Sequence, residues 1–198
     1  KNPYGEAPIT SLQDLGIGSV RIEFKDSSEG DQTPTDGFSF FDPKIDAYHA
    51  SNIEILMIID YSSLAGTPWG SSDASAWTAF SEKYSARASM IATHYKGKIS
   101  AYQIWNEPDL VGDESYKPYI PSQSYGKILK KAYETIKAAD PTAKVITGSF
   151  ASGNMNYISQ MKSAVSGIIY ADAVAIHPYG QRAPDNMPQP QWGFGNLS

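Results

Sequence analysis

The sequence has no cysteine, few basic residues and no long apolar run, and each absence removes a class of function. Without cysteine the chain can form neither disulfides nor thiolate metal sites. Its 16 Lys and Arg residues stand against 21 Asp and Glu, a net charge of −5 that leaves no basic stripe for nucleic acid. Since no apolar stretch is long enough to span a bilayer, no membrane partner is expected either.

Histidine is also scarce, with His49, His94 and His177 as the three examples. None lies at metal-ligand spacing from another, so the sequence predicts no metal site and no cofactor. His49 and His94 fall in expected helices and should face solvent. His177 ends an apolar run, a position more typical of a hydrogen-bonded wall residue than of a base or ligand.

Short β-rich runs alternate with longer amphipathic stretches along the chain. The expected strands are dense in Val, Ile and Tyr: Ser19–Phe24, Ile53–Asp60, Ile99–Asn106, Lys144–Gly148 and Ala173–His177. Nearly continuous apolar runs are typical of strands covered on both faces. The expected helices are Ser11–Leu15, Asp42–Ala50, Ala74–Tyr95, Ser122–Ala139 and Met155–Ala164, with Ser72 or Asp73 as an N-cap. This alternation predicts an α/β fold with parallel strands.

Such a sheet could be open and doubly wound, or closed into a barrel. An open sheet usually carries a Gly-rich phosphate loop after an early strand, but Gly16-Ile17-Gly18 precedes its strand. Polar residues end several of the strands instead: Arg21, Glu23, Asp60, Asn106, Glu107, His177 and Tyr179. A (β/α)8 (TIM) barrel gathers its active site at that rim, so the barrel is favoured.

The expected barrel is incomplete in this sequence. A full barrel has eight strands and typically ~250 residues, whereas only five or six strands can be found here. We therefore expect residues 1–198 to be a partial barrel catalytic domain comprising about the second to sixth strands. The remainder of the barrel is expected in the same or another chain.

The tripeptide Asn106-Glu107-Pro108 is the strongest chemical signal. A carboxyl group at the end of a strand points into the rim, and the following Pro108 ends the strand. Burial near aromatic residues such as Trp105 would disfavour the ionised form of Glu107, which suits an acid catalyst. A bare Asn-Glu-Pro could merely open a loop, but its place after Ala101–Trp105 favours catalysis.

The stretch Ile99–Asp109, containing Tyr-Gln-Ile-Trp-Asn-Glu-Pro-Asp, resembles the fourth strand of clan A glycoside hydrolases, above all families 39 and 5. Leu15–Arg21 resembles the second strand of that clan, Tyr125–Lys144 the approach to the fifth, and Ala173–Tyr179 the sixth. The resemblance implies that Glu107 is the acid/base and that Asn106 contacts the sugar 2-hydroxyl. It also implies that Arg21 supports the active-site carboxylates and that His177 and Tyr179 face the cleft.

The resemblance implies a retaining cleavage of β-linked poly- or oligosaccharide by two carboxylates. Retention needs two carboxyl groups ~5–5.5 Å apart, and the clan takes its nucleophile from a Glu on the seventh strand, which is not found in this sequence. The 198 residues alone are therefore expected to be inactive. Glu23 and Asp60 are weaker candidates for the second carboxylate; Glu23 reads more simply as an ion-pair partner of Arg21 and Lys25, and Asp60 as a hydrogen-bonding rim residue.

Aromatic residues could stack against sugar rings. Trp69, Tyr179 and Trp192 are the candidates, and for Trp69 and Trp192 ordinary packing is equally compatible. Two other functions stay open: a carbohydrate-binding or truncated barrel fragment without turnover, and a Schiff-base lyase using Lys25. Because polysaccharide substrates are extracellular, a secreted protein is expected.

Overall fold

The computed structural model describes residues 8–26, 36–111 and 118–178. Helices and strands alternate in chain order: α1 (Ile9–Asp14), β1 (Ser19–Glu23), α2 (Gly37–Ala50), β2 (Glu54–Ile59), α3 (Ala74–His94), β3 (Ala101–Asn106), α4 (Ser122–Ala139), β4 (Lys144–Ser149) and α5 (Met155–Ser163). The four strands form one parallel sheet in the order β1-β2-β3-β4, with neighbours in sequence also neighbours in space. This is the arrangement of a partial (β/α)8 barrel, as the sequence predicts.

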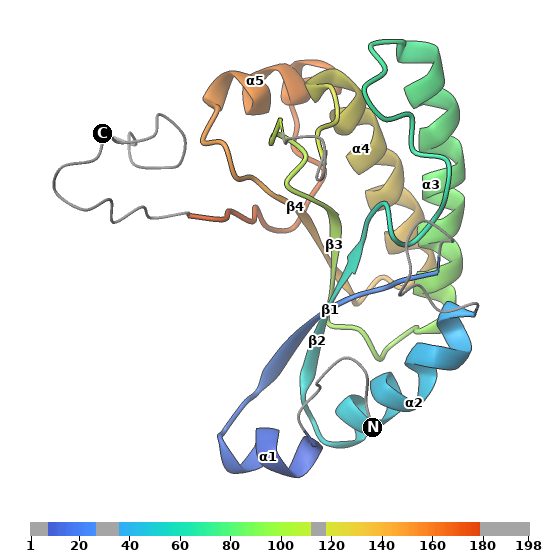
Figure 1. Ribbon diagram of the computed structural model, residues 1–198, viewed down its shortest axis with the longest axis vertical. Helices are drawn as coiled ribbons and strands as arrows, with labels where there is room; N and C mark the ends of the chain where they lie inside the picture. Colours follow the sequence, from blue (N-terminus) through green and yellow to red (C-terminus); the bar gives the residue numbers. More distant parts are fainter. Residues whose placement is uncertain (1–7, 27–35, 112–117, 179–198) are drawn as a thin grey trace, which may run out of the picture.

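Helices α2, α3 and α4 lie along one side of the sheet (Figure 1). Because side chains alternate along a strand, each strand sends one set of residues toward these helices. From β2 these are Ile55, Met57 and Ile59, all fully buried. They join Phe24 and the apolar stripes of the helices in one hydrophobic core.

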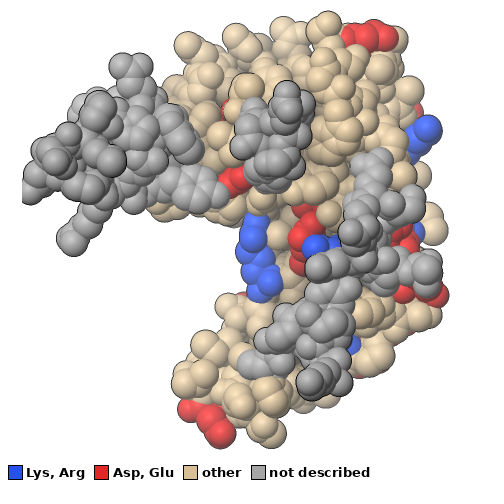
Figure 2. Space-filling view, in the orientation of Figure 1, with Lys and Arg blue, Asp and Glu red and all other residues tan. Residues whose placement is uncertain are grey.

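The opposite side of the sheet carries the polar residues, and we call it the open face. It is defined by Arg21 and Glu23 of β1, Asp60 at the end of β2, and Gln103 of β3, each alternating with residues that face the helices. No helix among the described residues covers this face (Figure 1). Figure 2 shows the molecule hollowed here, with basic and acidic side chains lining the hollow.

The predicted helical stripes are confirmed. Trp77, Phe80 and Tyr84 of α3 are buried, and Asp73 caps that helix by accepting a hydrogen bond from the Ser75 backbone N–H at 2.8 Å. The predicted start of α2 at Asp42 is wrong by more than a turn. The helix begins at Gly37 because the Asp36 side chain accepts from the Ser39 N–H.

The predicted strand Ala173–His177 is also only partly right. This segment lies parallel to β4, but it pairs through isolated bridges from Ala173 to Ile146 and from Ile176 to Phe150. The ladder is interrupted because the Ala175 N–H donates to the Thr147 hydroxyl at 3.0 Å instead of to a backbone carbonyl. The segment nevertheless carries the chain to His177 at the same end as the other strand termini.

Among the described residues, no helix combines the length and the apolar character needed to cross a membrane. Four of the exposed apolar side chains lie beside the two outer edges of the sheet. Leu15 and Ile17 precede β1, and Val174 and Ile176 lie beyond β4.

Candidate active site

The end of β3 has an unusual backbone. Trp105 has φ 72° and Glu107 has φ 52°, both in the left-handed region that L residues rarely adopt. Two bonds hold this conformation: the Gln103 amide donates to the Trp105 carbonyl at 2.8 Å, and the Trp105 indole donates to the Pro118 carbonyl at 2.7 Å. Strained backbone of this kind clusters at functional sites. Here it breaks the strand alternation around Asn106.

Arg21 reaches across the sheet to this strand end. Its Nε donates to Gln103 Oε1 at 3.2 Å and its Nη2 donates to Asn106 Oδ1 at 3.0 Å. The predicted ion pair between Arg21 and Glu23 does not form, because the guanidinium is directed to these two amides. The structure thus places Arg21 and Asn106 together on the open face, and it fixes the orientation of the Asn106 amide.

Glu107 is buried, with 3% of its surface exposed, and its Oε1 lies 2.7 Å from His177 Nδ1. The two residues are far apart in sequence, and they meet because β3 and the segment beyond β4 end at the same rim. The expected burial of Glu107 is confirmed. His177 is a hydrogen-bonded wall residue beside the carboxyl group, as expected of a histidine at the end of an apolar run.

Asp109 was not recognised as a site residue from the sequence. Its buried carboxylate accepts hydrogen bonds from the backbone N–H groups of Ala151 and Ser152, both at 2.9 Å, and from the Ser152 hydroxyl. These bonds fasten the loop after Glu107 to the loop after β4. The sequence signal was the acidic residue at the end of Asn-Glu-Pro-Asp, but its partners are visible only in three dimensions.

An aromatic cluster lies next to the end of β3. The Trp69 ring centroid is 5.4 Å from Tyr61 and 6.0 Å from Trp105, and Tyr61 is 5.5 Å from Trp105. Trp105 is fully buried, whereas Trp69 is 39% exposed. Trp69 therefore combines packing with an accessible ring near Asn106 and Glu107. Tyr61, which was missed from the sequence, supports it.

Glu23 and Asp60 form a second acidic group on the open face. Asp60 is 1% exposed, and burial, followed by the negative charge of Glu23, raises its pKa to about 8. Its side chain accepts from the Ser62 N–H at 2.8 Å and hydrogen-bonds to Glu23. Lys25 Nζ lies 3.5 Å from Glu23, which confirms the predicted ion pair with lysine. A carboxyl group that holds its proton at neutral pH is a poor nucleophile, which argues against Asp60 as the second catalytic carboxylate.

Two residues expected to contact sugar, Tyr179 and Trp192, lie outside the described residues. Lys25 is committed to Glu23, so the structure gives no support to a Schiff-base role. His49 and His94 are exposed on α2 and α3, as expected, and His94 Nε2 lies 2.8 Å from Asp42.

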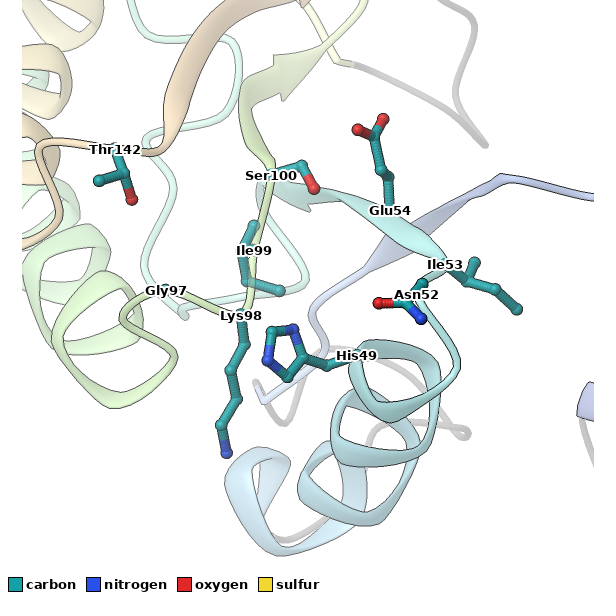
Figure 3. Close-up of a pocket in the computed structure, with 9 residues that line it drawn as sticks. All are labelled: His49, Asn52, Ile53, Glu54, Gly97, Lys98, Ile99, Ser100 and Thr142. Carbon is teal, nitrogen blue, oxygen red and sulfur yellow. The ribbon is translucent and has the colours of Figure 1, made fainter.

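A separate pocket lies at the opposite end of the strands. Its volume is about 400 Å³, and Figure 3 shows its lining: His49, Asn52, Ile53, Glu54, Gly97, Lys98, Ile99, Ser100 and Thr142. These residues precede β2, β3 and β4 or begin them. Catalytic residues of barrels gather at the other end of the strands, so this pocket is not part of the site around Glu107.

No protein-family model matches the sequence, and no curated protein matches it either. Solved structures do match. A broad-specificity endoglucanase of subfamily GH5-4 from Clostridium longisporum superposes with a TM-score of 0.64 and 14% identity, over 89% of this chain and 53% of that one. A family 39 glycoside hydrolase from Bacteroides cellulosilyticus superposes with a TM-score of 0.56 and 16% identity, over 84% of this chain and 34% of that one. A β-mannanase from Mytilus edulis superposes with a TM-score of 0.59 and 16% identity, over 87% of this chain and 62% of that one.

These similarities establish the fold as that of barrel glycoside hydrolases. The chain spans about half the length of the GH5-4 endoglucanase, 53%. A complete barrel of this kind therefore includes strands beyond the four described here.

Proposed function

We propose that this chain is part of a glycoside hydrolase that cleaves β-linked poly- or oligosaccharide with retention, with Glu107 as the acid/base. The observation that carries the proposal is a buried carboxyl group at a strand end, 2.7 Å from His177 and next to an amide oriented by Arg21. The barrel fold shared with solved glycosidases supports it.

In this mechanism Glu107 protonates the leaving glycosidic oxygen and then deprotonates the water that releases the sugar. His177 orients its carboxyl group, Asn106 binds a hydroxyl of the sugar, and Trp69 stacks against a sugar ring. Tyr179 is proposed to contact the same sugar. The nucleophile is proposed to be a Glu on a strand beyond the described residues, since Asp60 is protonated at neutral pH and Glu23 is engaged by Asp60 and Lys25.

The remaining barrel strands are the proposed structural partner, in the same or another chain. A carbohydrate polymer outside the cell is the proposed substrate, so we also propose that the protein is secreted.

The test is Glu107→Gln in the natural protein, with Glu54→Gln at the other end of the sheet as the matched control. On β-1,4-glucan and β-1,4-mannan we expect the Glu107 variant to lose about 10²–10⁴-fold in rate, the usual contribution of general acid catalysis. Dinitrophenyl β-glycosides should lose less in the first step, because their leaving groups need no proton. Azide should restore turnover and yield a β-glycosyl azide, which reports retention.

Full activity of the Glu107 variant would refute the assignment. Binding of oligosaccharides without hydrolysis by the wild type would instead favour a carbohydrate-binding barrel without turnover.

A further inference from the structure

The acidic group formed by Glu23 and Asp60 has no part in the proposed mechanism, yet it lies on the same face as Arg21 and Asn106. Glu23 follows Arg21 by two residues in β1, so both side chains leave the strand on the open face. Arg21 reaches Asn106. Glu23 therefore shares the open face with Asn106 and lies on the β1 side of it.

Next to Asp60, the Glu23 carboxylate and the Lys25 ammonium place a hydrogen-bond acceptor beside a donor, both accessible to solvent. The Glu23 and Lys25 side chains are 30% and 36% exposed, with Nζ and Oε2 3.5 Å apart. A sugar hydroxyl both donates and accepts hydrogen bonds, so two neighbouring hydroxyls can bind a carboxylate and an ammonium together. Neither charge is buried, which allows a ligand to reach both.

The buried Asp60 holds the partly exposed Glu23 side chain in place. Asp60 is almost completely buried, one oxygen accepts from the Ser62 N–H, and its carboxyl group hydrogen-bonds to Glu23. The Ser63 hydroxyl donates to the Phe24 carbonyl at 2.6 Å and accepts from the Asp60 N–H at 3.1 Å. These hydrogen bonds join the ends of β1 and β2 next to the backbone of Glu23.

We propose that Glu23 and Lys25, positioned by the buried carboxyl group of Asp60, form a subsite that binds two neighbouring hydroxyl groups of a carbohydrate chain on the open face. Glu23 is the specificity-determining residue and Asp60 a positioning residue. The inference rests on the proposed function in that both take a carbohydrate as ligand, but it does not require hydrolysis.

The groups facing Asp60 define its response to pH. Glu23 and Lys25 face it from β1 and the residues after it, and the Tyr84 hydroxyl faces it from α3. The Arg87 side chain of α3 is paired with Asp26. Burial and Glu23 keep Asp60 protonated below about pH 8. Above that pH two adjacent carboxylates repel each other, and Glu23 loses its support.

The experiment is calorimetric titration of the chain with cellotetraose, mannotetraose and xylotetraose at pH 6 and pH 9, all in a Glu107→Gln background. We expect Glu23→Gln to weaken binding of at least one tetraose by about 10–100-fold, the range for a hydrogen bond to a charged group. Glu54→Gln is the matched control, since Glu54 begins β2 at the opposite end of the sheet, and it should bind as the parent does.

Asp60→Asn separates positioning from a merely structural role. The Glu107→Gln parent should lose roughly tenfold in affinity between pH 6 and pH 9. This is the effect expected if ionisation of Asp60 and ligand binding are coupled by about one pKa unit. Asp60→Asn keeps a donor toward Glu23 at both pH values, so its affinity should change little. Circular dichroism checks that each variant is folded.

Equal affinities of Glu23→Gln and the Glu54→Gln control would overturn the subsite, as would a parent that binds none of the three tetraoses. An unchanged fall in affinity with pH in Asp60→Asn would overturn the role of Asp60. Glu23-dependent binding by a protein that never hydrolyses β-glycosides would leave the subsite standing while the catalytic proposal fails.

Discussion

The buried carboxyl group of Asp60 makes stability depend on pH in a way that one substitution should remove. Its pKa is about 8 in the folded protein, against an ordinary value of 3.8, because burial and the charge of Glu23 disfavour ionisation. Below pH 3.8 both the folded and the unfolded chain hold the proton, and the group costs no stability. As pH rises toward 8, the unfolded chain releases the proton while the folded chain keeps it, so stability is progressively lost.

The size of the stability loss follows from the pH range between the pKa of Asp60 in the unfolded chain, 3.8, and in the folded protein, about 8. One extra proton bound by the folded state lowers the free energy of unfolding by about 1.4 kcal/mol per pH unit. Between pH 5 and pH 7 the loss is therefore about 2–3 kcal/mol. Asp60→Asn has the same shape and no charge to suppress, so relative to the wild type it should gain about that much stability over the same interval.

The assay is urea unfolding of wild type and Asp60→Asn at pH 5, 6, 7 and 8, followed by circular dichroism. The quantity compared is the difference in free energy of unfolding at each pH, which cancels the other titrating groups. Asp14→Asn, an exposed aspartate on α1, is the control and should show a constant difference. A constant difference for Asp60→Asn as well would refute the reasoning, because Asp60 would then ionise at the same pH in both states.

Two further predictions concern the packing beneath the site. Tyr125→Phe removes a hydroxyl that donates to the Ile104 carbonyl at 2.9 Å and accepts from the Gly148 N–H at 2.6 Å. Urea unfolding should show that the free energy of unfolding falls by about 1–3 kcal/mol. The control Tyr133→Phe, on the same helix but less buried, should lose less. Gly148→Ala places a Cβ 2.8 Å from both the Ile104 carbonyl oxygen and Pro108 Cδ, and should lower stability by at least about 1–3 kcal/mol; a melting temperature equal to the wild type would contradict this.

The fold was predictable because its signals are local. The apolar stripes of α3 and α4 repeat at helical spacing, and the strands are runs of Val, Ile and Tyr bounded by polar residues. The errors arose where a tertiary contact overrides a local signal. The predicted start of α2 at Asp42 is too late because burial of Phe41 and the cap at Asp36 extend the helix to Gly37.

The site was predictable only in part, for a related reason. Glu107 and Asn106 stand at the end of an apolar run in a recognisable motif, so their position could be derived from the sequence. Gln103 sits inside the run and reads as an ordinary strand residue until Arg21 is seen to bond to it. Tyr61 and Asp109 likewise acquire meaning only from neighbours contributed by other strands and loops.

The left-handed backbone at Trp105 and Glu107 explains why so many bonds converge on one strand end. Each such residue costs of order 1–3 kcal/mol, so the conformation persists only if its surroundings fix it. The Gln103 amide and the Trp105 indole each contribute a buried hydrogen bond of about 1 kcal/mol, and the packing of the indole among Tyr61, Phe80 and Tyr84 adds more. A regular strand would send successive side chains to opposite faces. The irregular one allows Asn106 to bond to Arg21 while the adjacent Glu107 bonds to His177, which brings an amide and a carboxyl group together at one rim of the sheet.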